Sequence, residues 1–263
     1  MKYLNITVVF LLLSVSSTLH AGIVFQEDFE GYSSGTNLGG QGGWSVISGP
    51  NIKVEYSSAF GSNIARGAEN SPAGSGHSRI QHDLVDSPTN GLLSLEYDHR
   101  ANLDGKRSHN SSLSFTQAGN RSGWWVNNNP NTGARNINFQ TSTGYEEFLL
   151  GTSPFDTINH LEVILDYDSN ETFGRADING IMYETSRYAV DQTFLDNVGL
   201  TIYNDYRYTY GSPYTTGIDI DNIIVTSSSA VPEPSTYALI ILGLIGVGAC
   251  RRKKGSVAKF FGG

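Results

Sequence analysis

Apolar and polar residues alternate along the middle of the chain in short runs, and this period of two is typical of half-buried β-strands. The apolar members of three such runs are Leu93, Leu95 and Tyr97; Leu113 and Phe115; and Ile137 and Phe139. Long runs with helical periodicity do not occur between residues 22 and 230. The pattern therefore predicts an all-β domain.

The clearest strand covers residues 161–168, where every odd position is apolar or aromatic. Asn179-Gly180 follows between residues 176–178 and 181–183 and predicts a type I′ hairpin, because both residues tolerate positive φ angles. Two more strands are predicted over 198–203 and 218–225. Many short strands separated by turns are typical of a sandwich or jelly roll.

The two ends of the chain have a different pattern. Lys2, an apolar run over 8–15 and a small residue at Ala21 are typical of a secretory signal peptide. Near the other end, 14 mostly apolar residues, 237–250, precede four basic residues, 251–254. As a helix this run would reach only ~21 Å against ~30 Å of bilayer hydrocarbon. It is therefore a marginal membrane span, with the basic residues on the cytoplasmic side.

These boundaries predict five segments: a signal peptide at 1–21, a β-sandwich domain at 22–226, a linker at 227–230, a sorting tail at 231–254 and a cytoplasmic extension at 255–263. Residues 22–230 hold 11 basic and 24 acidic residues, a formal net charge of −13. This charge argues against a nucleic-acid partner, whose phosphates it would repel. The only cysteine is Cys250, so the domain forms no disulfide.

The tail Val231-Pro232-Glu233-Pro234-Ser235, its apolar run and its basic cluster resemble a PEP-CTERM sorting tail. The resemblance implies that an exosortase recognises Pro232, Glu233 and Pro234 and removes the tail during export. It also implies a Gram-negative bacterium that makes extracellular polysaccharide, with the protein at the cell surface or in the extracellular matrix.

Two stretches of the domain also resemble known families. The opening from Gln26 to Trp44 is similar to that of many exported PEP-CTERM proteins. The strand 161–168, the Asn-Gly hairpin and Ile220-Asp221-Asn222-Ile223 resemble laminin-G and concanavalin-A-like jelly rolls. The expected fold is therefore an all-β jelly-roll sandwich, flanked by a signal helix and a single C-terminal hydrophobic helix. A β-sandwich of the carbohydrate-binding-module kind is the alternative.

Asp166 and Asp168 are the catalytic candidates. On one strand they would stand ~6.6 Å apart, near the spacing of glycosidase carboxylate pairs. Concanavalin-A-like folds include β-glucanases, but the spacing here does not match their signature. Asp166, Asp168 and Asn170 also partly match a calcium loop. The alternative is that these are solvated acids leading into a turn.

A structural calcium ion is a further expectation. Glu27, Asp28 and Glu30 precede or close the predicted first strand, and Asp219 and Asp221 lie in the last. First and last strands of jelly rolls are often neighbours, so these carboxylates could gather around one ion. The alternative is solvation of an edge strand.

Aromatic residues supply the candidates for glycan binding. If residues 203–214 are extended, Tyr206, Tyr208 and Tyr210 form a row on one face, where rings could stack on sugars. Trp124 and Trp125 are adjacent and should face opposite ways. The alternative for both groups is packing against the sheet.

Three hypotheses follow. The first is a non-catalytic exported sandwich that binds extracellular polysaccharide. The second is a polysaccharide hydrolase or lyase that uses Asp166 and Asp168. The third is a purely structural matrix protein without a ligand.

Overall fold

The computed structural model describes residues 22–49, 52–67, 75–84, 88–102, 108–117, 119–129, 134–149, 157–207 and 217–228. These residues fall within one compact unit, Ala21–Ser229. The predicted signal peptide, sorting tail and cytoplasmic extension lie outside the described residues. Within the described residues, no helix is long and apolar enough to cross a membrane.

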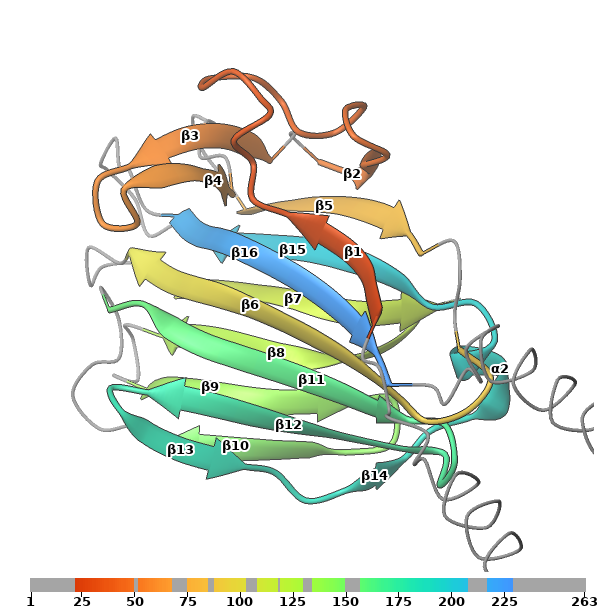
Figure 1. The fold of residues 1–263 in the computed structure, drawn as a ribbon. Helices are drawn as coiled ribbons and strands as arrows, with labels where there is room; N and C mark the ends of the chain where they lie inside the picture. Colours follow the sequence, from red (N-terminus) through yellow and green to blue (C-terminus); the bar gives the residue numbers. More distant parts are fainter. Residues whose placement is uncertain are drawn as a thin grey trace, which may run out of the picture. The chain divides into compact units, whose positions relative to one another are not determined.

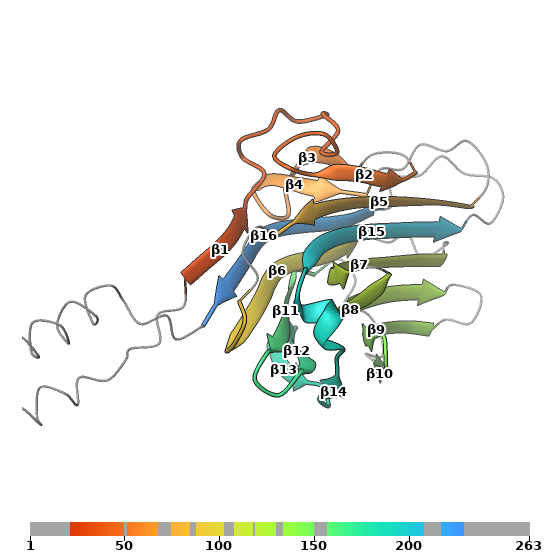
Figure 2. The same ribbon diagram turned by 90° about the vertical axis from the view of Figure 1, so that its right-hand side faces the viewer.

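Two antiparallel sheets form the domain and lie face to face (Figures 1 and 2). In the described part of the chain, the first sheet runs in the order β13 (Ile181–Glu184), β12 (Glu171–Ile178), β11 (Asn159–Asp166), β6 (Leu92–Asn102), β16 (Gly217–Ser227), β4 (Ser62–Arg66) and β3 (Lys53–Ser57). Two shorter strands join it: β1 (Gly22–Glu27) pairs with β16, and β14 (Tyr188–Ala189) pairs with β12.

The second sheet has the order β10 (Tyr145–Leu149), β9 (Ala134–Thr141), β8 (Asn120–Asn129), β7 (Ser108–Gln117), β15 (Gly199–Arg207), β5 (Ser75–Asp83) and β2 (Ser45–Ser48). A single helical turn, α2 (Gln192–Leu195), connects β14 to β15 and buries Phe194 and Leu195. The all-β jelly-roll prediction is confirmed for this domain.

The core lies between the sheets and consists of the apolar positions that the alternation singled out. The first sheet contributes Leu93, Leu95 and Tyr97 of β6, and the second sheet contributes Leu113 and Phe115 of β7. All five are fully buried. Ile137 and Phe139 of β9 join them. Because alternate side chains point to opposite faces, the intervening residues of each strand lie on an outer surface.

The predicted Asn-Gly hairpin is confirmed, because Asn179 and Gly180 have φ angles of 54° and 78° between β12 and β13. The first and last strands are neighbours, as expected: β1 pairs with residues 223–227 of β16. The strand predicted over 161–168 ends at Asp166, and Asp168 lies in the turn before β12.

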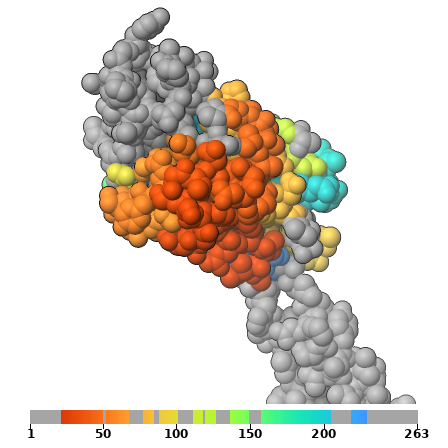
Figure 3. Space-filling model, turned by 90° about the horizontal axis from the view of Figure 1, so that it is seen from above, coloured from red at the N-terminus to blue at the C-terminus, as the bar shows by residue number. Residues whose placement is uncertain are grey.

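The N-terminal part of the domain closes one side of the sandwich. Phe29, Leu38 and Trp44 are buried in the core, although the segment between β1 and β2 is irregular. Figure 3 shows this segment in red and orange, spread over the end of the domain that it covers. Turn residues thus complete a core that the strands alone would leave open.

Candidate functional site

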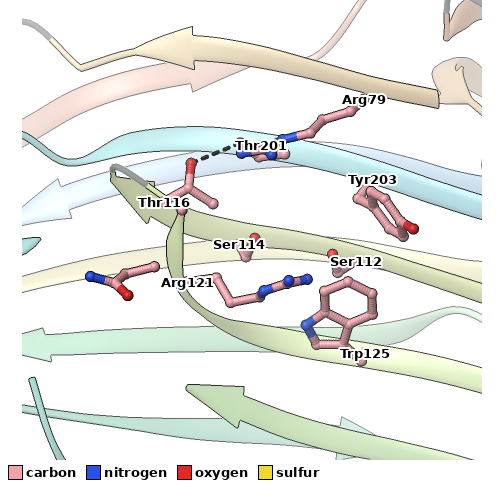
Figure 4. A pocket seen from close by; sticks show the side chains of 10 residues that line it. Arg79, Ser112, Ser114, Thr116, Arg121, Trp125, Thr201 and Tyr203 are labelled. Carbon is pink, nitrogen blue, oxygen red and sulfur yellow. Dashed lines mark hydrogen bonds between the residues drawn. The ribbon is translucent and has the colours of Figure 1, made fainter. Parts of the chain in front are cut away.

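A pocket lies on the outer face of the second sheet, over β5, β7, β8 and β15 (Figure 4). The face exists because β7 turns Leu113 and Phe115 inward and Ser112, Ser114 and Thr116 outward. The pocket has a volume of about 100 Å³. That is room for several water-sized groups.

Small side chains form its floor. Ser112, Ser114 and Thr116 come from β7 and Thr201 from β15, and the hydroxyls of Thr116 and Thr201 share a hydrogen bond of 2.7 Å. Gly123 is the cross-strand partner of Ser114. A Cβ atom there would lie 2.4 Å from the Ser114 Cβ and 2.8 Å from a backbone oxygen, so the position accepts no side chain.

Two aromatic rings border the pocket. The centroids of the Trp125 and Tyr203 rings are 5.2 Å apart at an interplanar angle of 50°. The Arg121 guanidinium lies 4.7 Å above the Trp125 ring, in the geometry of a cation–π contact, and Figure 4 shows it directed toward Ser112 and Trp125. The rings and the guanidinium therefore hold one another in place.

Two arginines, Arg79 and Arg121, line the same pocket. Burial lowers the pKa of Arg121, and the neighbouring positive charge of Arg79 lowers it further. Among the residues that the structure describes, neither guanidinium forms an ion pair, and the lining residues include no carboxylate. The pocket is thus positively charged within an acidic domain.

Three buried polar atoms at the pocket have no hydrogen-bond partner in the described part of the chain. They are the Nε of Arg79, the Oγ of Ser112 and the Nε1 of Trp125. A buried donor without a partner costs about 1–3 kcal/mol, so such groups usually meet water or a ligand. Their clustering at one pocket suits a polar ligand that accepts hydrogen bonds.

The adjacent tryptophans face opposite ways, as expected. Trp124 is fully buried in the core and donates from its Nε1 to the Glu162 carbonyl at 2.8 Å. Trp125 is 5 % exposed and borders the pocket. The packing alternative therefore holds for Trp124, which no ligand can reach in this structure, whereas Trp125 remains a candidate.

The tyrosine row lies largely outside the described residues. Tyr206 belongs to β15, where its backbone is opposite Gly76 and His109. Its side chain, and Tyr208 and Tyr210 entirely, are outside the described part of the structure. Their part in glycan binding stays a prediction.

Asp166 and Asp168 are engaged in the turn between β11 and β12. The Asp166 Oδ1 accepts hydrogen bonds from the backbone N–H groups of Asp168 and Ser169. The Asp168 Oδ1 accepts one from Gly91, at 3.1 Å. Neither residue lines the pocket, so the structure separates these carboxylates from the site described here.

The calcium candidates have protein partners of their own. Asp219 is fully buried and pairs with Arg66 and Arg100, and Asp221 accepts a hydrogen bond from Ser62. The other two, Asp28 and Glu30, accept backbone hydrogen bonds. Within the described ranges, no group of three or more metal-ligating side chains is found. A structural calcium ion stays a prediction.

Sequence reasoning missed Arg79, Arg121, Tyr203 and the serines of β7. Alternation alone would have placed Arg121, Gly123 and Trp125 on one face of β8. It could not have shown that β15 lies between β7 and β5, which brings Arg79 and Tyr203 to the same place.

Comparison with known families identifies the tail. Residues 230–253 match the PEP-CTERM protein-sorting motif. This motif indicates an exported protein that exosortase sorts to the cell surface. A search of the curated proteins finds no match to the sequence.

Comparison with solved structures shows that the domain has a jelly-roll fold similar to that of lectins of the concanavalin-A type. Lectin II from Ulex europaeus aligns with a TM-score of 0.54 at 8 % identity, covering 78 % of this chain and 99 % of that one. The CBM2 module of the evolved Dit protein of Lactobacillus casei BL23 phage J-1 aligns with a TM-score of 0.51 at 9 % identity. The alignment covers 79 % of this chain and 96 % of that one. A glycosyl hydrolase family protein from Mycobacterium fortuitum aligns with a TM-score of 0.52 at 9 % identity. The alignment covers 78 % of this chain and 99 % of that one. At these identities the likeness shows the fold alone.

Proposed function

We propose that the chain is an exported, exosortase-processed protein that binds a glycan through the pocket on the second sheet and is not catalytic. After processing, it acts at the cell surface or in the extracellular polysaccharide matrix of a Gram-negative bacterium. The observation that carries the proposal is the contact of Trp125 with Tyr203 beside a polar pocket where three buried polar atoms have no hydrogen-bond partner among the described residues.

Sugars match this arrangement for two physical reasons. Their C–H faces pack against flat aromatic rings, and their hydroxyls exchange hydrogen bonds with polar side chains. Tyr203, packed against the buried Trp125, supplies ring surface, while Ser112 and Arg79 supply polar atoms that have no partner among the described residues. A lectin-like jelly roll supports the proposal by analogy of fold only.

A hydrolase or lyase on the same fold is the alternative, favoured by the likeness to a glycosyl hydrolase family protein. It requires a paired acid and base near a bound sugar. Asp166 and Asp168 stabilise a turn instead, and no carboxylate is found among the described residues that line the pocket. Release of reducing ends or of unsaturated sugars from a polysaccharide, lost in Asp166→Asn, would favour the enzyme.

The first test uses residues 21–229, which form a compact unit with a core of their own. Retention is measured on immobilised exopolysaccharide from the producing bacterium and on dextran, xylan and polygalacturonate. Tyr203→Ala should weaken retention by about two- to tenfold, as stacking contributes roughly 0.5–1.5 kcal/mol. Tyr56→Ala is the matched control, because Tyr56 is an exposed tyrosine of β3 in the other sheet.

The same measurement addresses the structural ion and the third hypothesis. Retention that disappears in chelator and returns with calcium would support an ion in the site or the fold. No retention on any polysaccharide, with wild-type thermal unfolding, would contradict glycan binding and favour a purely structural matrix protein.

A further inference from the structure

We infer that the pocket selects glycans carrying an anionic substituent, a carboxylate or a sulfate, which is held between Arg79 and Arg121. This inference rests on the proposed function and adds the class of sugar that the site recognises. It follows from the charges, the unpartnered atoms and the size of the pocket.

The two pocket arginines differ from the other arginines whose side chains the structure describes. Four others all pair with acids: Arg66 with Glu55 and Asp219, Arg100 with Asp219, Arg175 with Glu162 and Glu184, and Arg187 with Asp166 and Glu171. In a domain with 24 acidic residues, a partner for an arginine is easy to supply. Arg79 and Arg121 nevertheless have none among the described residues.

Leaving these charges uncompensated has an energetic cost. The two guanidinium groups repel each other, and both are partly removed from water, which lowers the pKa of Arg121. An anion placed between them would relieve both effects, because guanidinium N–H groups bind carboxylate and sulfate oxygens with paired, charge-assisted hydrogen bonds.

The buried polar atoms without a partner lie in the same pocket as the two arginines. Ser112 is 1 % exposed and Trp125 is 5 % exposed, yet the Oγ and Nε1 atoms have no partner in the described residues. Both residues line the pocket beside the Arg121 guanidinium (Figure 4). Together with the Arg79 Nε, these are hydrogen-bond donors, as an anion requires.

The pocket size limits what enters. A volume of about 100 Å³ admits a substituent such as a carboxylate with a few waters. The sugar ring itself would then rest at the rim against Tyr203. The domain's net charge of −13 would repel polyanions elsewhere, so affinity for an acidic glycan has to come from this local site.

The test compares three defined probes on the domain 21–229 by isothermal titration. They are oligogalacturonate, which carries carboxylates, dextran sulfate oligomers, which carry sulfates, and neutral dextran oligomers. At least one acidic probe should bind about tenfold tighter than the neutral one. Its affinity should fall when salt rises from about 0.05 M to about 1 M, because screening weakens the charge contacts.

The decisive comparison is between two double variants. One combines Arg79→Gln and Arg121→Gln at the pocket, and the other, the control, combines Arg175→Gln and Arg187→Gln. Both pairs remove two positive charges, but the control residues lie away from the pocket, Arg175 in β12 of the other sheet and Arg187 in the segment between β13 and β14. The pocket pair should lose about tenfold or more of the affinity for the acidic probe, and the control pair less than twofold. Thermal unfolding of each variant establishes that the fold is intact.

The outcomes separate the two proposals. Equal binding of neutral and acidic probes, lost in Tyr203→Ala but unchanged in the pocket-arginine pair, would overturn the anionic inference and keep glycan binding. Equal losses in both arginine pairs would also overturn it, since general charge would then explain the effect. No binding of any probe, with no retention on the native exopolysaccharide, would overturn both.

Discussion

Asp219 is a fully buried carboxylate of the last strand, and two arginines share its charge. Arg66 binds it through Nε at 2.7 Å and through Nη2 at 2.9 Å, and Arg100 approaches at 3.3 Å. Removing one member of a buried ion pair leaves the partners uncompensated. The Asp219 carboxylate therefore joins β16 to β4 and β6, which provide these arginines.

Asp219→Asn should lower the free energy of unfolding by about 3 kcal/mol, because the charges of Arg66 and Arg100 lose their buried partner. Urea denaturation measures the loss. Glu55→Gln is the control, since Glu55 also pairs with Arg66 but is 36 % exposed in its side chain, and should cost less than about 1 kcal/mol. Similar losses in the two variants would contradict this account.

A second prediction at the scale of one residue concerns Gly174. A Cβ there would lie 2.6 Å from the Phe139 ring and 2.7 Å from the Trp124 ring, which pack over the bare backbone of β12. Gly174→Ala should therefore destabilise the domain by about 1–3 kcal/mol through overpacking. Gly31→Ala, where a Cβ meets nothing within 4 Å, is the control. If thermal unfolding showed that Gly174→Ala leaves the stability unchanged, the tight packing would be refuted.

At the scale of elements, β11 and β6 carry a cross-strand pair that depends on pH. His160 lies opposite Asp98, and its Nδ1 is 3.0 Å from the Asp98 Oδ1. This hydrogen bond raises the pKa of His160 above 6.5. Burial acts to raise the pKa of Asp98, but the hydrogen bonds from His160 and Asn222 outweigh it and lower that pKa below 3.8.

The signs define a pH window for this pair. The His160 contribution is fully present below about pH 6.5 and is lost as pH rises through the raised pKa. The Asp98 contribution is present above about pH 3.8 and is lost as pH falls through the lowered pKa. His160→Gln should thus cost about 0.5–1 kcal/mol near pH 5.5 and less near pH 9, as the imidazole is half exposed.

A double-mutant cycle with Asp98→Asn, followed by urea denaturation at both pH values, isolates the pair. A coupling free energy that is the same at the two pH values would show that the interaction is a neutral hydrogen bond.

The strands could be predicted because burial on one face imposes alternation, which is visible over a few residues, as at Leu93, Leu95 and Tyr97. The Asn179-Gly180 hairpin could be predicted for a similar reason: its φ angles are a local requirement. The pocket could not be predicted in this way, because its residues come from four strands whose neighbours are set by the whole sheet. These residues include Arg79, Ser112, Arg121 and Tyr203.

At the scale of the whole molecule, the charge distribution separates the parts of the chain by role. Residues 22–230 carry a formal net charge of −13, whereas residues 251–254 are all basic. Within the acidic domain, Arg79 and Arg121 form a local exception at the pocket. A domain of this charge repels anions over most of its surface, so the anion binding proposed above is confined to the place where it presents arginines.

The sorting motif gives the last prediction, which concerns the whole chain in the cell. Replacing Pro232, Glu233 and Pro234 with alanine should block processing, because the match over 230–253 contains the Pro-Glu-Pro sequence expected to be recognised. An unprocessed protein should then remain in the membrane fraction with its apolar run and basic cluster attached. Immunoblots of membrane, surface and medium fractions measure this.

The control is Ser235→Ala, which changes the next residue and leaves the Pro-Glu-Pro sequence intact. It should be processed like the natural protein. Normal surface display of the triple-alanine protein would contradict recognition through Pro-Glu-Pro, whereas equal retention of both variants in the membrane would place recognition on a longer stretch of the tail.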